Sequence, residues 1–245
     1  MARSEEFLNL YRQLEELLRN RYAGKRLQNS SPFFQFLNER ESQPFKDDLN
    51  ACREMRNILS HCTDIHGDPP LEPSEGAITL LREVVEYLKQ PPRALDYATQ
   101  SDKIFTANFS DNAAMVMEKM IERGFSHIPV LENGLFFGMF SISTLFSATL
   151  EHQEFFDIQK TVVGDFKKYL PIENHIAESF MFFPRNATLL EVKSTLGEVQ
   201  SNTAKRLATV LITNTGRTTE PLLGLLTPWD VLGKPTQKIH LHDKK

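Results

Sequence analysis

Apolar residues in the first 90 positions recur at intervals of three and four, the spacing of one face of an α-helix. In the first such stretch, residues 5–22, the apolar positions are Phe7, Leu8, Tyr11, Leu14, Leu17 and Leu18. The same spacing predicts further helices over residues 32–38, 44–62 and 75–90. Ser74 is the expected N-cap of the last helix, and Pro91 with Pro92 ends it. Residues 1–90 are therefore expected to form an all-helical bundle, and residues 91–100 a linker.

Beyond residue 100 the pattern changes to short apolar runs that alternate with helical stretches. The predicted strands are 104–107, 127–131, 135–140, 180–183, 207–213 and 222–227, and the predicted helices are 112–123, 143–155, 189–199 and a short final one. The same order of elements thus occurs twice, which predicts two small α/β repeats, 101–158 and 159–236, before a tail at 237–245. The expected fold class is α+β, a helical bundle followed by a tandem repeat.

Composition excludes several classes of protein. The chain has 245 residues, of which 40% are hydrophobic and 24% charged, so it is neither collagen-like nor disordered. A net charge of −4 argues against a surface that binds nucleic acid as a whole. Two cysteines, Cys52 and Cys62, exclude a disulfide scaffold. Without a signal-peptide pattern or a run of about 18 apolar residues, we expect a cytoplasmic protein that makes no membrane contact.

Each repeat ends in a similar motif, FGMFSISTLF at 137–146 and LGLLTPWDVL at 223–232. In both, a glycine and two apolar residues precede a hydroxyl residue, and a polar residue follows three positions later. A hydroxyl at a helix start, such as that of Thr227, can bind phosphate together with free backbone N–H groups. Asp230, one turn further, can accept hydrogen bonds from both ribose hydroxyls. The alternative is a helix cap, because the same spacing makes a capping box.

The repeats resemble a tandem pair of cystathionine beta-synthase (CBS) domains. The resemblance covers about residues 100–236 and rests on the end motif, the IFTANFS segment, the Met-rich helix and the HIPV strand. It implies a regulatory adenine nucleotide (AMP, ADP or ATP), with the aspartate on the ribose and Ser or Thr near the phosphate. Carried over to this sequence, it assigns Thr227 and Asp230 to nucleotide binding.

The sequence departs from that pattern in both repeats. The first repeat has Ser141 but carries Thr144 where the aspartate is expected, and the second has Thr209 at the position of Pro129 and a longer hairpin. We therefore expect one good nucleotide site, with the other degenerate or repurposed. Candidate adenine-side contacts are Thr106, Phe182 and Phe183. The alternative for these three is that they fill the core as strand residues.

The helix over 44–62 has a polar face that ends in an imidazole. At 100° per residue, one arc holds Arg53, Arg56, Asn57, Ser60 and His61, and the opposite arc holds Cys52, Met55, Ile58, Leu59 and Cys62. RNA cleavage needs a group that exchanges protons near neutrality and a cation for the phosphorane, which imidazole and guanidinium provide. The amide of Asn57 is one turn from His61 and can orient its ring. The alternative is that Arg56 and His61 pair with acids across the bundle or a dimer interface.

The string Arg56-Asn57-Ile58-Leu59-Ser60-His61 resembles the HEPN superfamily (higher eukaryotes and prokaryotes nucleotide-binding) over about residues 1–90. The resemblance implies a metal-independent endoribonuclease with Arg56, Asn57 and His61 as catalytic residues, in a site that a dimer completes. One HEPN subgroup carries a modified tyrosine where this chain has Thr63. A zinc site built from Cys52, His61, Cys62 and His66 would lack a recognised spacing, so no metal is expected.

Together these patterns predict a cytoplasmic homodimer in which a CBS pair senses an adenine nucleotide and controls an N-terminal ribonuclease that acts on RNA. The alternative is a non-catalytic regulatory or interaction module whose helical domain only dimerises or binds a partner.

Overall fold

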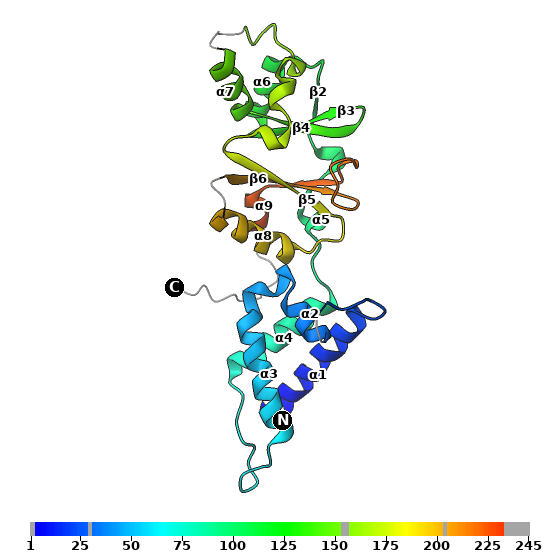
Figure 1. The fold of residues 1–245 in the computed structure, drawn as a ribbon, viewed down its shortest axis with the longest axis vertical. Helices are drawn as coiled ribbons and strands as arrows, with labels where there is room; N and C mark the ends of the chain where they lie inside the picture. The colour runs from blue at the N-terminus through cyan, green and yellow to red at the C-terminus, as the bar shows by residue number, and fades with distance from the viewer. Residues whose placement is uncertain (1–2, 29–30, 153–156, 203–204, 233–245) are drawn as a thin grey trace. The chain divides into compact units, whose positions relative to one another are not determined.

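The computed structural model describes residues 3–28, 31–152, 157–202 and 205–232 (Figure 1). The chain divides into two compact units, one ending at Pro92 and the other beginning at Arg93. The predicted tail at 237–245 and the end of the helix predicted over 143–155 lie outside the described residues. Over the described ranges, no helix combines the length and the apolarity needed to cross a membrane.

The first unit contains the four predicted helices, α1 (Arg3–Arg21), α2 (Pro32–Leu37), α3 (Lys46–His61) and α4 (Glu75–Lys89). Ser74 caps α4 as expected, because its Oγ accepts a hydrogen bond of 3.2 Å from the amide of Ala77. Pro44 was expected to open the third helix but lies inside a separate 3₁₀ turn, Arg40–Phe45. Proline suits this tighter turn, which lacks the long hydrogen-bond ladder that its ring would interrupt.

Buried aromatic and aliphatic side chains fill the first unit, with Phe7, Leu14 and Leu18 from α1 and Ile78 and Leu81 from α4 almost wholly inaccessible. A buried carboxylate joins three of its elements. Glu41, in the 3₁₀ turn, is 3% exposed and pairs with Arg21 of α1, and it accepts a 2.9 Å hydrogen bond from the Tyr87 hydroxyl of α4. Because this charge is paired and hydrogen-bonded, its burial is tolerated.

Two sheets organise the second unit. The first contains β2 (Ala107–Asn108), β3 (His127–Glu132) and β4 (Leu135–Ser141), and the second has the order β1-β7-β6-β5. In the second sheet these strands are β1 (Thr99–Gln100), β5 (Glu178–Pro184), β6 (Arg206–Thr213) and β7 (Gly224–Leu226). β2 runs parallel to β3 and β5 runs parallel to β6, while β4 and β7 are antiparallel to their neighbours. The two sets of elements therefore share one order and one pairing pattern.

The helices of this unit are α6 (Ala113–Arg123) and α7 (Ile142–His152) in the first set, and α8 (Leu189–Asn202) and α9 (Pro228–Leu232) in the second. The strand predicted over 104–107 is wrong for most of its length, since only Ala107 and Asn108 pair with β3. The backbone N–H of Ile104 bonds instead to Ser101 at the end of a 3₁₀ turn, Ser101–Lys103.

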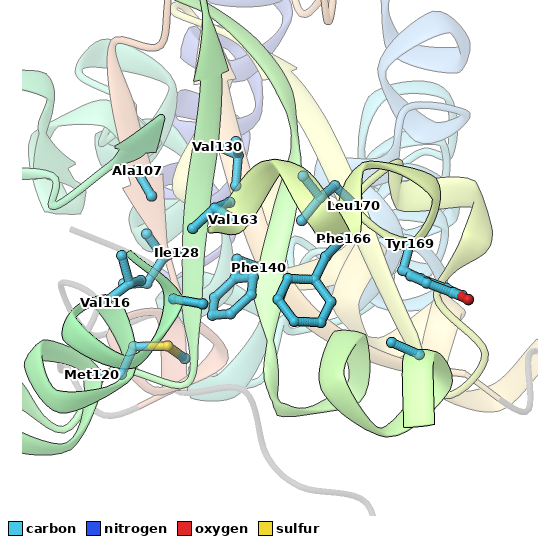
Figure 2. Close-up of a cluster of buried hydrophobic side chains, with 12 residues drawn as sticks. Ala107, Val116, Met120, Ile128, Val130, Phe140, Val163, Phe166, Tyr169 and Leu170 are labelled. Carbon is cyan, nitrogen blue, oxygen red and sulfur yellow. The ribbon is translucent and has the colours of Figure 1, made fainter. Parts of the chain in front are cut away.

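Both predicted boundaries of the first repeat need correction. The expected linker 91–100 contains α5 (Ala94–Tyr97) and β1, which pack on the second sheet: the Ala94 amide donates to the carbonyl of Ala187 (2.9 Å), and Thr99 pairs with Leu225. At the other end, the 3₁₀ helix Val163–Tyr169 lies in the core of the first set (Figure 2). Short polar connections give little periodicity, which is why the sequence did not assign them.

Candidate nucleotide-binding site

In the second repeat, the motif places Thr227 between β7 and α9. The amide and the hydroxyl of Thr227 both donate to Oδ2 of Asp230, at 2.9 and 2.8 Å, and the amide of Asp230 donates to the carbonyl of Thr227 (3.1 Å). The two residues are half-buried. The end motif correctly predicted that these two residues meet. Fewer backbone N–H groups are free to bind a phosphate than expected, because the Thr227 and Asp230 amides are hydrogen-bonded and Pro228 has no N–H.

One oxygen of the Asp230 carboxylate is thus held in place, and the other, Oδ1, makes no hydrogen bond with the described residues. A carboxylate oxygen has two lone-pair sites and accepts only, so Oδ1 is suited to two neighbouring hydroxyl donors such as those of a ribose. The capping bonds and a ligand contact use different oxygens, and the two interpretations of this pair are compatible.

The first repeat has the same backbone arrangement with a different acceptor. The Ser141 amide donates to Oγ1 of Thr144 (3.1 Å), which replaces the aspartate carboxylate, and that hydroxyl donates to the carbonyl of Met139 (3.4 Å). Ser141 and Thr144 are each 1% exposed. The motif of the first repeat is therefore closed to solvent, whereas that of the second repeat is open.

The motif glycines are required by close packing. A Cβ atom on Gly138 would lie 2.2 Å from the carbonyl oxygen of Leu170, and one on Gly224 would lie 2.9 Å from Cβ of Ala98 and Cδ1 of Leu95. In the first repeat the obstacle is backbone, and in the second it is side chains of α5 and the residue after it. Gly138 therefore lets β4 lie close to Leu170, and Gly224 lets β7 lie close to Leu95 and Ala98.

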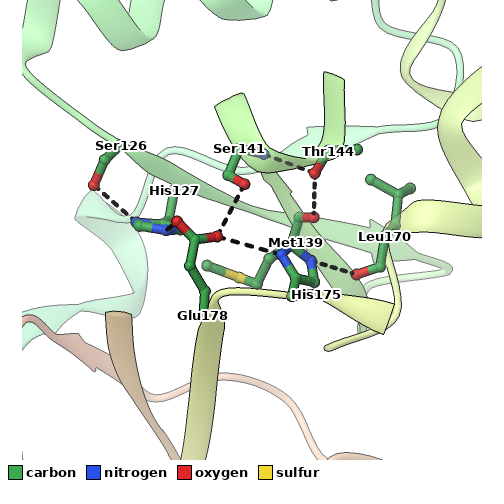
Figure 3. Close-up of polar contacts among 8 residues, drawn as sticks. All are labelled: Ser126, His127, Met139, Ser141, Thr144, Leu170, His175 and Glu178. Atoms are coloured by element: carbon green, nitrogen blue, oxygen red, sulfur yellow. Dashed lines mark hydrogen bonds and ion pairs between the residues drawn. The ribbon is translucent and has the colours of Figure 1, made fainter. Parts of the chain in front are cut away.

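A polar cluster that the sequence did not indicate lies beside Ser141 (Figure 3). Glu178, the first residue of β5, accepts a hydrogen bond from the Ser141 hydroxyl (3.3 Å) and pairs with His127 (3.0 Å) and His175 (3.4 Å). Burial opposes ionisation of Glu178, but the contacts with His127 and His175 outweigh it and hold the pKa of the carboxyl well below its usual range. The feature of the sequence that could have indicated this cluster is an acidic residue at the first position of a buried strand.

The candidate adenine-side residues differ in their surroundings. Phe183 is 5% exposed and belongs to the core of the second repeat, as the alternative for it predicted. Phe182 is half-buried and packs edge-on against Phe136 of β4, with ring centroids 5.2 Å apart. Thr106 is half-buried before β2, and no hydrogen bond between described residues joins it to Thr227 or Asp230. A cavity of about 430 Å³ beside α7 includes none of these residues in its lining.

In the helical unit, Arg56 is engaged within the chain. Its Nη2 donates to Oε1 of Glu15 in α1 (2.8 Å), its Nη1 donates to Oδ1 of Asn57 (3.3 Å), and its guanidinium lies 5.6 Å from the ring centroid of Tyr11. Arg53 similarly lies over Phe34, at 5.1 Å. The polar face of α3 therefore packs on α1 and α2 through cation–π contacts.

Among the described residues, His61 makes no hydrogen bond with Arg56 or Asn57, the other two members of the predicted catalytic set. His61, the last residue of α3, is exposed, and the amide oxygen of Asn57 accepts from Arg56. Two residues of the opposite, apolar arc are also exposed, Ile58 at 41% and Cys62. The last turn of α3 extends beyond the core formed by its earlier residues, Leu49 and Cys52.

Comparison with known families identifies one segment. A model of the CBS domain family matches residues 96–151. Residues 96–151 are thus similar to a CBS domain. The matched segment includes β2 to β4, α6 and most of α7, with the closed motif of Ser141 and Thr144 near its end. No curated protein matches the sequence.

Several solved structures resemble the chain at low identity. CbpB in complex with c-di-AMP is 15% identical, with a TM-score of 0.44 over 63% of this chain and 89% of that one. CBSX2 in complex with AMP is 17% identical (TM-score 0.42, 58% of this chain and 94% of that one). Hypoxic Response Protein I with two coordinated zinc ions is 14% identical (TM-score 0.41, 59% and 99%). Among the described residues here, no group of three His, Cys, Asp or Glu is placed to hold a metal ion.

Proposed function

We propose that the chain is a nucleotide-sensing regulatory protein built on a tandem CBS pair, and that its second repeat binds an adenine nucleotide through Thr227 and Asp230. The observation that carries this proposal is Oδ1 of Asp230, which has no hydrogen-bond partner among the described residues and is oriented by the two bonds that Thr227 donates to Oδ2. An acceptor held in this way loses little conformational freedom when a ribose binds, which favours affinity. The matching strand order of the two repeats supports the pairing of the CBS domain with a second one.

The helical unit is proposed to act through contacts with a partner or a second copy, without catalysis. The observation that favours this alternative is the internal ion pair of Arg56 with Glu15, because it occupies the guanidinium that a ribonuclease would direct at phosphate. The cavity beside this pair measures about 160 Å³, well below the roughly 300–1,000 Å³ of typical ligand sites. Homodimerisation stays a prediction that sedimentation of the purified protein would check.

A variant at Arg56 distinguishes the two proposals for the helical unit. Arg56→Ala is expected to lower the free energy of unfolding by about 1 kcal/mol, through the lost ion pair and ring contact, while Arg12→Ala at an exposed position changes it little. Labelled RNA is expected to stay intact with the wild type and with both variants. Cleavage by the wild type that is lost in Arg56→Ala and in His61→Ala would instead establish the ribonuclease.

A thermal-shift screen tests the nucleotide site. AMP, ADP, ATP and c-di-AMP are the first probes, and we expect at least one to raise the melting temperature of the wild type by about 5–11 °C when present at 100 times its dissociation constant. Asp230→Ala should remove the shift, while Asp157→Asn, at an exposed aspartate that pairs with Lys160, should keep it. A shift that persists in Asp230→Ala would place the ligand elsewhere, and no shift with any probe would contradict the proposed function.

A further inference from the structure

The carboxylate of Glu178 is surrounded by groups that would suit a bound anion. It comes from β5 of the second repeat, but two of its partners, His127 and Ser141, belong to the first repeat. His127 Nε2 lies 3.0 Å from Oε1 without the alignment of a hydrogen bond, so this contact is electrostatic, while Ser141 Oγ donates to Oε2. Glu178 itself is 8% exposed.

The ring of His175 also contacts the carboxylate of Glu178. Its Nδ1 lies 3.4 Å from Oε2 of Glu178, and its Nε2 lies 3.4 Å from the backbone carbonyl of Leu170. A carboxylate and a carbonyl oxygen only accept, so both contacts can be hydrogen bonds together only when both ring nitrogens carry a proton. His175 is 2% exposed, and within the described residues Glu178 is the acid placed to balance its charge.

The remaining histidine contacts the other carboxylate oxygen. Ser126 Oγ lies 2.8 Å from Nδ1 of His127, and Nε2 of the same ring lies 3.0 Å from Oε1 of Glu178. The carboxylate is therefore enclosed by two imidazole rings and the Ser141 hydroxyl (Figure 3). Paired, hydrogen-bonded charges of this kind are the form in which buried ions persist in proteins.

We propose that the junction of the two repeats is an anion-binding site whose occupant is the chain's own Glu178 carboxylate. The hydroxyl of Ser141, which corresponds to that of Thr227 in the open repeat, is directed at this internal carboxylate and is unavailable to a ligand. The first repeat is thereby closed, and the protein binds one nucleotide per chain. This last consequence rests on the proposed function, whereas the anion site stands on the contacts of Glu178 alone.

Chemical rescue with acetate tests the site directly. Glu178→Ala removes one methylene and the carboxylate, which acetate replaces almost atom for atom. We expect the melting temperature of purified Glu178→Ala to fall well below that of the wild type, and sodium acetate to raise it by about 3 °C or more relative to sodium chloride at equal ionic strength. Acetamide, which has the same shape without the charge, should raise it less.

Controls define the outcomes that would overturn the proposal. The wild type and Glu118→Ala, at an exposed position of α6, should show no acetate-specific shift. An equal response in all three proteins, or an equal response to acetamide and acetate in Glu178→Ala, would contradict an anion site. If Glu178→Ala does not fold, nitrogen-15 spectra of the wild-type histidines decide, because a His175 ring with one unprotonated nitrogen at neutral pH would also overturn the proposal.

Failure of the nucleotide proposal would be recognised separately. A wild type that binds none of the adenine nucleotides, but whose Glu178→Ala variant is rescued by acetate, loses the proposed function and keeps the anion site. A wild type that binds two nucleotides per chain, one of which is lost in Ser141→Ala, keeps the proposed function and refutes the closed first repeat.

Discussion

Gly138→Ala is expected to destabilise the second unit by about 3 kcal/mol or more, among the largest losses that a single added methyl group produces. The new Cβ would lie 2.2 Å from the carbonyl oxygen and 2.4 Å from the carbonyl carbon of Leu170. Because both atoms are backbone, no rotamer change relieves the overlap. β4 would have to move from this segment and break the 2.8 Å hydrogen bond from the Met139 amide to the same carbonyl.

Urea denaturation followed by circular dichroism measures this loss, and two other glycines calibrate it. Gly224→Ala should cost less, because its 2.9 Å contacts are with side-chain atoms of Ala98 and Leu95 that can shift. Gly76→Ala, in the first turn of α4, meets only the Ser74 hydroxyl at 3.8 Å and should be neutral or stabilising by up to about 1 kcal/mol. A Gly138→Ala protein as stable as Gly76→Ala would contradict the packing described for the motif.

Glu178→Gln is expected to lower the free energy of unfolding by about 3–5 kcal/mol at pH 7, the usual cost of leaving a buried charge without its partner. The amide keeps the shape of the side chain, so the loss reports the charge that balances the two histidines. Glu118→Gln, at an exposed site, should stay within about 0.5 kcal/mol of the wild type.

The difference between Glu178→Gln and the wild type should depend on pH with a definite sign. The folded-state pKa of Glu178 is depressed, so its contribution is fully present above the unfolded-state pKa of about 4.3 and is lost as the pH falls from there towards the folded-state value. Urea titrations at pH 5.5 and 4, below the usual titration range of histidine, should give a smaller difference at the second value. A difference that grows as the pH falls would contradict an ionised Glu178.

Local patterns were sufficient to predict much of the fold. The spacing of Phe7, Tyr11, Leu14 and Leu18 defines the face of α1 that is buried, and Ser74 sets the start of α4. The end motifs predicted both the turn at Thr227 and its pairing with Asp230, because a hydroxyl and an acid three residues apart meet at a helix start whatever surrounds them.

Contacts between distant segments were not predictable in this way. Arg56 meets Glu15 across 41 positions, and Ser141 meets Glu178 across 37, through the packing of separate elements. The residues after 91 and after 158 carry few apolar positions, yet Ala94 and Phe166 complete the cores of the two repeats. One or two buried side chains per segment are too few to produce a recognisable hydrophobic periodicity, so their packing can be seen only in the structure.

Isothermal titration calorimetry with the nucleotide that the thermal screen identifies tests the proposed sensor most directly. The wild type should bind one nucleotide per chain, and Asp230→Ala should weaken binding by about 10- to 100-fold, the equivalent of one or two charge-assisted hydrogen bonds. Ser141→Ala should leave affinity and stoichiometry unchanged. Equal affinity of the wild type and Asp230→Ala would contradict a nucleotide site at Thr227 and Asp230.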